Sequence, residues 1–146
     1  MKRFLGVLFL SMILSHTAMA VTTIPWTKEG CESVKGTWIT AKSATDAGCD
    51  TAHCNGKNFC RGRVRMNWWS ALIWCQSIGH RMPDLETACP NALSSGAYCA
   101  NLYGPNNEDV WTSTPIDANY VYKLGHGGRE PQGWIKDAQQ GVICSE

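Results

Sequence analysis

The sequence lacks a hydrophobic run long enough to cross a membrane. Its longest one, Phe4 to Leu14, has eleven residues, whereas a membrane-spanning helix needs about 20. Lys2 and Arg3 precede this run, and the small-residue pattern Ala18-Met19-Ala20 follows it. This order is typical of a secretory signal peptide cleaved after Ala20. We therefore expect a secreted or periplasmic protein that does not span a membrane.

The sequence also lacks an excess of charge of either sign. Residues 1–20 hold two of the 13 Lys and Arg residues and none of the 12 Asp and Glu residues, which leaves the mature chain with a net charge of −1. Proteins that bind nucleic acids carry a basic patch or stripe that neutralises phosphates. Because this chain has no such excess, we expect no nucleic acid among its partners.

The chain contains none of the common catalytic motifs. G-x-S-x-G, H-E-x-x-H, the P-loop and the dinucleotide fingerprint are missing from it. A catalytic cysteine is disfavoured because the even number of cysteines leaves no spare thiol. We therefore expect a protein that is not an enzyme.

Cysteine, in contrast, is abundant. All eight cysteines follow the signal peptide: Cys31, Cys49, Cys54, Cys60, Cys75, Cys89, Cys99 and Cys144. An even number in an oxidising compartment indicates disulfides. The segment around His53 and Cys54 offers nitrogen and sulfur ligands for zinc, but structural zinc sites favour tighter spacings such as C-x2-C. We therefore expect four disulfides and no metal.

The clearest local element is a helix from Asn67 to Gly79. Asn67 is a favourable N-cap residue, and Gly79 is a favourable residue just after a C-cap. Between them, apolar side chains recur at steps of three and four residues, on one helical face: Trp68, Ala71, Leu72, Cys75 and Ile78. Asp84 predicts the cap of a short second helix, residues 85–89.

Strands are expected on both sides of these helices. β-Branched and aromatic residues indicate them at residues 36–40, 110–114, 120–124 and 141–144. Residues 41–62, 91–108 and 125–140 are rich in turn formers and are expected to be mostly loops. A strand, two helices and then several antiparallel strands predict an α+β fold.

Three segments together resemble the C-type lectin-like domain. Met66–Cys75 (MNWWSALIWC) is similar to its first helix, Val110–Pro115 (VWTSTP) to its central strand, and Val142–Glu146 (VICSE) to its terminal strand. The W-T-S-T motif is similar to that of the short bacterial form of the family. The resemblance implies that residues 63–146 form a core of two helices packed on a twisted antiparallel sheet. Residues 21–62 would be a Cys-rich N-terminal extension that contains the first strand.

The resemblance also implies a disulfide between Cys75 and Cys144. We expect Cys89 to pair with Cys99, because that bond would clamp the loop after the second helix. The other four cysteines have three possible pairings, among which we favour Cys54 with Cys60 and Cys31 with Cys49.

Calcium-dependent lectins of this family hold Ca²⁺ with a Glu-Pro-Asn-like triplet and a Trp-Asn-Asp strand. Glu130-Pro131-Gln132 and Trp134-Ile135-Lys136-Asp137 are similar in order. However, a single residue separates them, where the family has a long loop, and Lys136 puts a cation where an oxygen ligand belongs. Since Ca²⁺ takes six to eight oxygen ligands, we expect no cofactor, with Ca²⁺ as the less favoured alternative.

The function that the resemblance implies is binding. We expect a carbohydrate or a protein to contact the C-terminal loop region, residues 125–140, with residues 101–109 as a second contributor. Trp134 could stack on this ligand, and neighbouring polar side chains could hydrogen-bond to it: Arg129, Glu130, Gln132 and Asp137. The alternative is a structural or assembly component of a bacterial envelope structure or adhesin, which a large apolar patch near Trp69 or Trp26 would favour.

Overall fold

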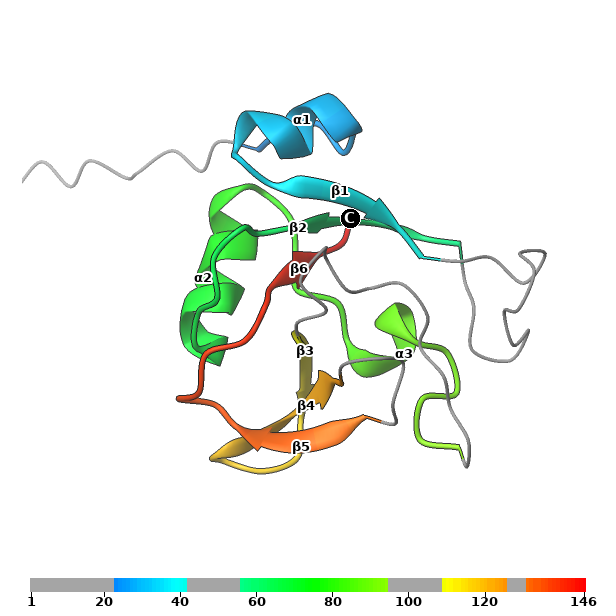
Figure 1. Cartoon of the computed structure of the whole chain (residues 1–146), viewed down its shortest axis with the longest axis vertical. Coiled ribbons are helices and arrows are strands. Elements are labelled where there is room, and N and C mark those ends of the chain that lie inside the picture. The colour runs from blue at the N-terminus through cyan, green and yellow to red at the C-terminus, as the bar shows by residue number, and fades with distance from the viewer. Residues whose placement is uncertain (1–22, 42–55, 95–108, 126–130) are drawn as a thin grey trace, which may run out of the picture.

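The computed structural model describes residues 23–41, 56–94, 109–125 and 131–146. In these ranges it has a mixed α+β architecture, with helices packed beside two three-stranded antiparallel sheets (Figure 1). This confirms the predicted fold class at that level. The proposed signal peptide lies outside the described residues, as do the following residues named above: Cys49, Cys54, Cys99, Arg129 and Glu130.

The first sheet joins the N-terminal part of the chain to its last strand. Its order is β1 (Thr37–Thr40), β2 (Asn58–Arg61) and β6 (Ile143–Cys144). β1 and β6 were predicted, but the expectation that residues 41–62 are a loop is wrong for β2. Its backbone pairs with a strand on each side, and Phe59 is fully buried. The composition of this segment does not show such pairing, which depends on β1 and on β6 from the far end of the chain.

The second sheet separates two hydrophobic clusters. Its order is β3 (Val110–Pro115), β4 (Tyr120–Leu124) and β5 (Gln132–Ile135). The predicted alternation of β4 is confirmed, since Val121 packs in one cluster with Trp111, and Leu124 packs in the other with Val110. The expectation of a loop over residues 125–140 is wrong for β5, which pairs with β4 over four residues.

The two predicted helices begin where their caps were expected. In α2 (Trp68–Ser77), the Asn67 side chain accepts a hydrogen bond from the Ser70 N–H at 2.9 Å. In α3 (Leu85–Ala88), Asp84 accepts one from the Thr87 N–H at 2.6 Å. These side chains satisfy backbone donors that a helix leaves unpaired at its start.

The helix α1 (Lys28–Ser33) has six residues and was not predicted within the N-terminal extension. The Thr27 hydroxyl accepts a hydrogen bond from the Gly30 N–H at 3.1 Å. Thr27 is therefore the N-cap residue, and it was the one local feature that could have indicated this helix. A helix this short depends on tertiary contacts rather than on propensity.

Two disulfides attach helices to the first sheet. Cys75–Cys144 joins α2 to β6, as the resemblance implies. Cys31–Cys60 joins α1 to β2, so the favoured pairing of Cys31 with Cys49 and of Cys54 with Cys60 is wrong. The physical reason is β2 itself, because its pairing with β1 places Cys60 beneath α1. Cys89 is also disulfide-bonded, but its expected partner lies outside the described residues.

Gly36 makes room for the Cys31–Cys60 bond. A Cβ atom at this position would come within 2.6 Å of the Sγ atoms of both cysteines.

No helix in the described parts of the chain is both long and apolar enough to cross a membrane.

Candidate functional site

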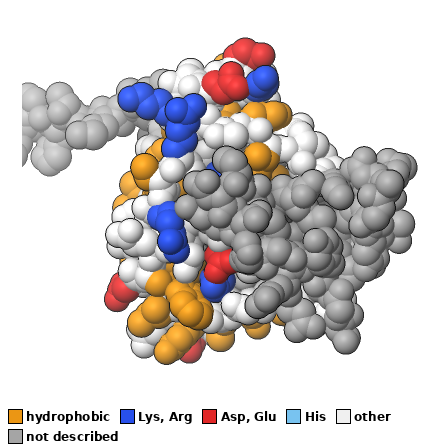
Figure 2. Space-filling model, in the orientation of Figure 1, with side chains coloured by type: hydrophobic (Ala, Val, Ile, Leu, Met, Phe, Trp, Pro, Cys, Tyr) orange, Lys and Arg blue, Asp and Glu red, His pale blue; other side chains and the backbone are white. Residues whose placement is uncertain are grey.

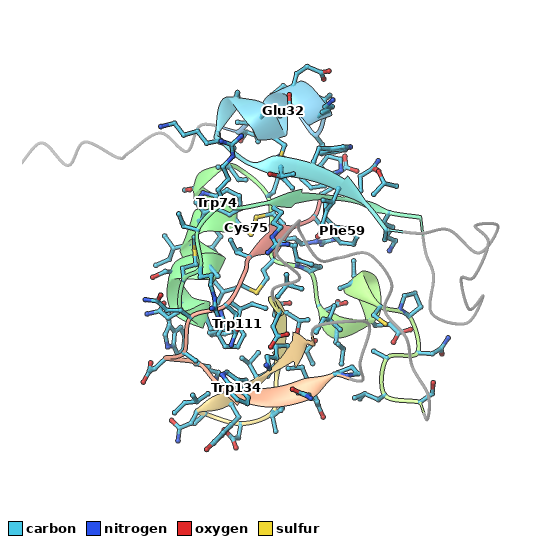
Figure 3. The ribbon with its side chains drawn as sticks, viewed as in Figure 1. Glu32, Phe59, Trp74, Cys75, Trp111 and Trp134 are labelled. Atoms are coloured by element: carbon cyan, nitrogen blue, oxygen red, sulfur yellow. A yellow bond between two sulfur atoms is a disulfide. The ribbon has the colours of Figure 1, made fainter. Side chains whose placement is uncertain are left out.

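The strongest candidate site lies along β5, the outer strand of the second sheet, and has Trp134 at its centre (Figure 3). Trp134 stands opposite Val121 of β4, and its side chain is 41% exposed. Gln132 is exposed two residues earlier. Because alternate residues of a strand share a face, Gln132 and Trp134 point to the same side of the sheet. The structure thus brings these two predicted residues together.

The other predicted residues do not join them in the described structure. Asp137 is exposed in the turn after β5, and it forms no hydrogen bond or ion pair with Trp134 or Gln132. Arg129 and Glu130 fall outside the described residues. From the second predicted stretch, residues 101–109, Asp109 alone is described.

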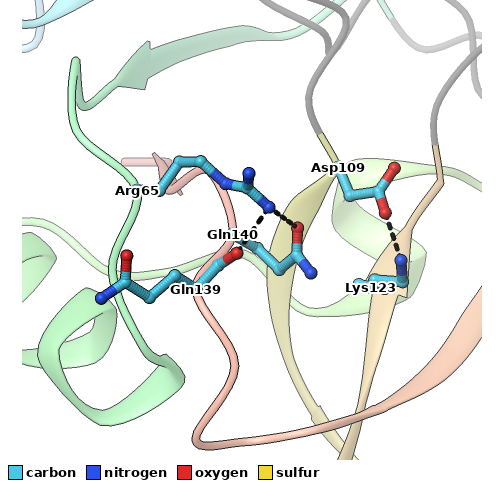
Figure 4. A network of polar contacts seen from close by, with 5 residues as sticks. All are labelled: Arg65, Asp109, Lys123, Gln139 and Gln140. Atoms are coloured by element: carbon cyan, nitrogen blue, oxygen red, sulfur yellow. Dashed lines mark hydrogen bonds and ion pairs between the residues drawn. The ribbon is translucent and has the colours of Figure 1, made fainter.

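Lys123, which the sequence analysis did not single out, holds the Trp134 ring in place. Its ammonium nitrogen lies 4.1 Å from the centre of that ring and forms an ion pair with Asp109 (Figure 4). The Lys123 side chain is almost fully buried. A buried ammonium needs such a partner, because removing a charge from water is costly. Its attraction to the face of the indole ring favours the orientation that Trp134 adopts in the structure.

A signal for Lys123 was present in the sequence. The alternation of β4 places it on the same face as Val121, which is a core residue. A lysine at a core-facing position needs an acidic or aromatic partner nearby. Asp109 supplies the acidic partner and Trp134 the aromatic one.

On the opposite face, the end of the sheet where β4 begins and β5 ends is apolar and exposed. Tyr120 and Ile135 stand opposite each other and are each 45% exposed, and Ile116 is 44% exposed. Ile116 packs close to Gly133, where an added Cβ atom would lie 2.7 Å from its Cδ1 atom. Figure 2 shows hydrophobic side chains gathered at the end of the molecule that holds β4 and β5. The edge of the sheet thus offers apolar contacts on both of its faces.

Lys136 occupies the position where the calcium-lectin pattern needs an oxygen ligand. It is buried, and its ammonium donates hydrogen bonds of 2.9 Å to the carbonyl oxygens of Asp117 and Ala118. The same nitrogen lies 4.8 Å from the centre of the Trp68 ring. Within the described ranges, no group of three or more His, Cys, Asp or Glu side chains could hold a metal ion.

Arg65 fastens the chain that follows β5. Its guanidinium donates hydrogen bonds to the Gln139 carbonyl at 2.7 Å and to the Gln140 side-chain oxygen at 3.1 Å (Figure 4). Two backbone hydrogen bonds between Met66 and Gln140 connect the same two segments of the chain. The turn after β5 is therefore tied to the start of α2.

Comparison of the chain with protein-family models, with curated proteins and with solved structures gives no match.

Proposed function

We propose that this protein is a secreted, non-enzymatic binding module of the C-type lectin-like type, and that it takes a protein ligand along the edge of β5 with Trp134 as the anchor. The observation that carries the proposal is the half-exposed Trp134 ring, which a buried ion pair holds in place. A tryptophan that is already oriented loses little freedom on binding, and tryptophans are enriched among the residues that dominate protein interfaces.

The backbone of β5 supports a protein ligand over other classes. β4 pairs with one side of this strand, and no described strand pairs with the other. An extended segment of a partner could add to such an edge through main-chain hydrogen bonds. Tyr120, Ile135 and Ile116 would supply apolar contacts on one face of the added strand, while Trp134 would supply them on the other.

The family assignment and the export are supported by separate features. The capped helix α2, the strand β3 and the disulfide from α2 to the terminal strand occur in the order that the resemblance implies. Disulfides persist in oxidising compartments, which agrees with the signal-peptide pattern of residues 1–20.

A carbohydrate is the second candidate ligand for the same surface. Trp134 and Gln132 lie on one face of β5, where an indole ring could stack on a sugar and an amide could hydrogen-bond to its hydroxyl groups. A sugar would use this face alone and would leave the exposed Tyr120–Ile135 pair on the other face without a role.

The test compares the wild-type protein with W134A and with W69A. Trp69 is a matched control, because it is 49% exposed on α2. Peptides selected from a displayed library on the wild-type protein should bind W69A equally and W134A at least about tenfold more weakly, as expected for an anchor residue. Equal binding to W134A would overturn the proposal. Binding to a glycan array that depends on Trp134, with no such peptide, would favour the carbohydrate.

A further inference from the structure

The backbone of β5 has an outer side, and the register of the sheet shows which residues form it. The Lys136 N–H, one residue past the strand, donates a hydrogen bond of 2.9 Å to the carbonyl of Asn119, just before β4. Hydrogen-bonded and non-hydrogen-bonded pairs alternate along an antiparallel ladder. The backbone groups of Trp134 therefore point toward β4, whereas those of Gly133 and Ile135 point away from it.

The hydrogen bonds on the far side of β4 agree with this direction. Tyr120 stands opposite Ile135, and its carbonyl accepts a hydrogen bond of 3.0 Å from the Ile116 N–H, directly after β3. Since the backbone of Tyr120 points toward β3, its pair with Ile135 is one without hydrogen bonds between the two residues. The Ile135 N–H therefore faces the outer side of β5.

The groups on this outer side differ in what they still need. The Ile135 carbonyl accepts a hydrogen bond of 3.1 Å from the Ala138 N–H. Within the described ranges, the Ile135 N–H and both backbone groups of Gly133 have no partner. Pro131, just before β5, has a carbonyl but no N–H, and the same alternation turns that carbonyl outward. The edge thus lacks a donor at Pro131 and has a carbonyl at Ile135 that needs none.

We propose that the protein ligand of the β5 edge is a second copy of this chain, paired antiparallel about a two-fold axis at Gly133. The inference rests on the proposed function, whose ligand it names. The Gly133 N–H of each copy donates to the Gly133 carbonyl of the other, and each Ile135 N–H donates to the Pro131 carbonyl of the other. Pro131, which cannot donate, then faces the Ile135 carbonyl that Ala138 already satisfies.

The composition of the edge also suits pairing with itself. β5 (Gln132–Ile135) contains neither a charged residue nor a proline, whereas edge strands that stay unpaired are usually protected by one or the other. Two copies therefore bring no like charges together along the paired strands, and no charged side chain has to be desolvated between them.

Ile116 supplies the apolar contact at the axis of this dimer. Its Cδ1 atom lies over Gly133, and its side chain is 44% exposed. Neighbouring strands lie about 4.8 Å apart, so the Ile116 side chains of the two copies meet across the Gly133 pair. On the other face, each Trp134 stands opposite Gln132 of the second copy, which covers the exposed indole ring.

The pairing stops at two copies. The opposite edge of the second sheet is β3, and its outer side is bonded to Gly141. The Trp111 N–H donates to the Gly141 carbonyl at 3.0 Å, and the Gly141 N–H donates to the Asp109 carbonyl at 2.8 Å. Because a two-fold contact uses the same surface on both copies, one dimer occupies both β5 edges.

Sedimentation velocity of the mature protein over a range of concentrations tests the proposal. The wild type should show a monomer–dimer equilibrium. I135P removes the outward N–H and should lower the association constant by about tenfold or more relative to I135A, as expected for two lost hydrogen bonds. I135A is the matched control, because it also removes the isoleucine side chain but keeps the N–H. Equal association of I135P and I135A would overturn the proposal.

Disulfide cross-linking tests the register without a proline in the strand. Opposite residues of a hydrogen-bonded antiparallel pair have Cα atoms about 5.5 Å apart, a distance that a disulfide can span. G133C should therefore give a disulfide-linked dimer on oxidation. I135C is the control, because its two copies would lie four residues, or about 14 Å, apart along the strands. Equal cross-linking of the two variants, or none of G133C, would overturn the proposal.

The failure of this inference can be told apart from that of the proposed function. A wild type that stays monomeric at all concentrations, while selected peptides bind it and bind W134A more weakly, would rule out the second copy and leave the β5 edge to another protein. A monomeric wild type whose selected peptides bind W134A equally would overturn both.

Discussion

The ammonium group of Lys123 contacts the face of the Trp134 ring while it is ion-paired with Asp109, the residue that precedes β3. One buried cation thus connects β4 and β5 to the residue before β3, since Lys123 comes from β4 and Trp134 from β5. The exposed ring therefore has a position that depends on an interaction inside the protein.

Breaking this ion pair should destabilise the protein more than breaking an exposed pair. In a double-mutant cycle with K123M and D109N, we expect a coupling energy of about 1–3 kcal/mol, because contacting residues in one polar network couple in this range. Urea unfolding of the four proteins measures it. The exposed pair Lys28–Glu32, at 3.9 Å on α1, serves as the control and should couple by less than about 0.5 kcal/mol. Equal coupling in the two cycles would contradict the prediction.

The cap of α3 should make stability depend on pH. The hydrogen bond from the Thr87 backbone N–H holds the pKa of Asp84 below its ordinary value of 3.8, and Arg81 and Lys57 add to the effect. A lowered pKa in the folded state means that the stabilisation is present above the unfolded pKa and is lost as the pH falls through the folded value.

The measurement is urea unfolding of the wild type, D84N and D84A at neutral and at strongly acidic pH. D84A should lose about 1 kcal/mol at neutral pH, as for other N-cap replacements. D84N keeps an acceptor but cannot ionise, so it should show a smaller loss of stability on acidification than the wild type. An identical acid response in D84N and the wild type would argue against a role for this carboxylate.

The two disulfides should differ in their contribution to stability. The cysteines of Cys75–Cys144 are 69 residues apart in sequence and those of Cys31–Cys60 are 29 apart. In the chain-entropy model these loops correspond to about 4.4 and about 3.6 kcal/mol. The double replacement C75A/C144A should therefore lower the free energy of unfolding more than C31A/C60A does. Thermal unfolding of both variants measures the two losses of stability, and a free-thiol assay verifies that the remaining disulfides are intact. A larger loss in C31A/C60A than in C75A/C144A would contradict the prediction.

The helices were largely predictable because their determinants are local. Asn67 and Gly79 bracket α2, and Gly79 adopts the positive φ of 80° that favours glycine after a helix. Asp84, the N-cap residue of α3, likewise predicted where that helix begins. The strand β4 could be recognised from its alternating side chains, and both of its faces pack as that pattern predicts.

The strands that sequence patterns missed depend on pairing with other strands rather than on their own residues. β2 lies among cysteines and turn formers, and β5 contains Gly133, so neither resembles a strand until β1, β6 or β4 pairs with it. The pairing of Cys31 with Cys60 was missed for the same reason, because it depends on β2. Cys60 lies opposite Cys144 in the sheet, yet each bonds to a helix. For the candidate site, Trp134 and Gln132 were found by residue type, whereas Lys123 emerges from the sheet register.

These two disulfides also limit the effect of proteolytic cleavage on the protein. A cut between residues 31 and 60 leaves both pieces attached through Cys31–Cys60, and a cut between residues 75 and 144 leaves them attached through Cys75–Cys144. In either case the nicked protein would migrate as one band on a non-reducing gel and separate into fragments after reduction. As long as these disulfides stay oxidised, the β5 edge would remain linked to the rest of the protein after such a cut.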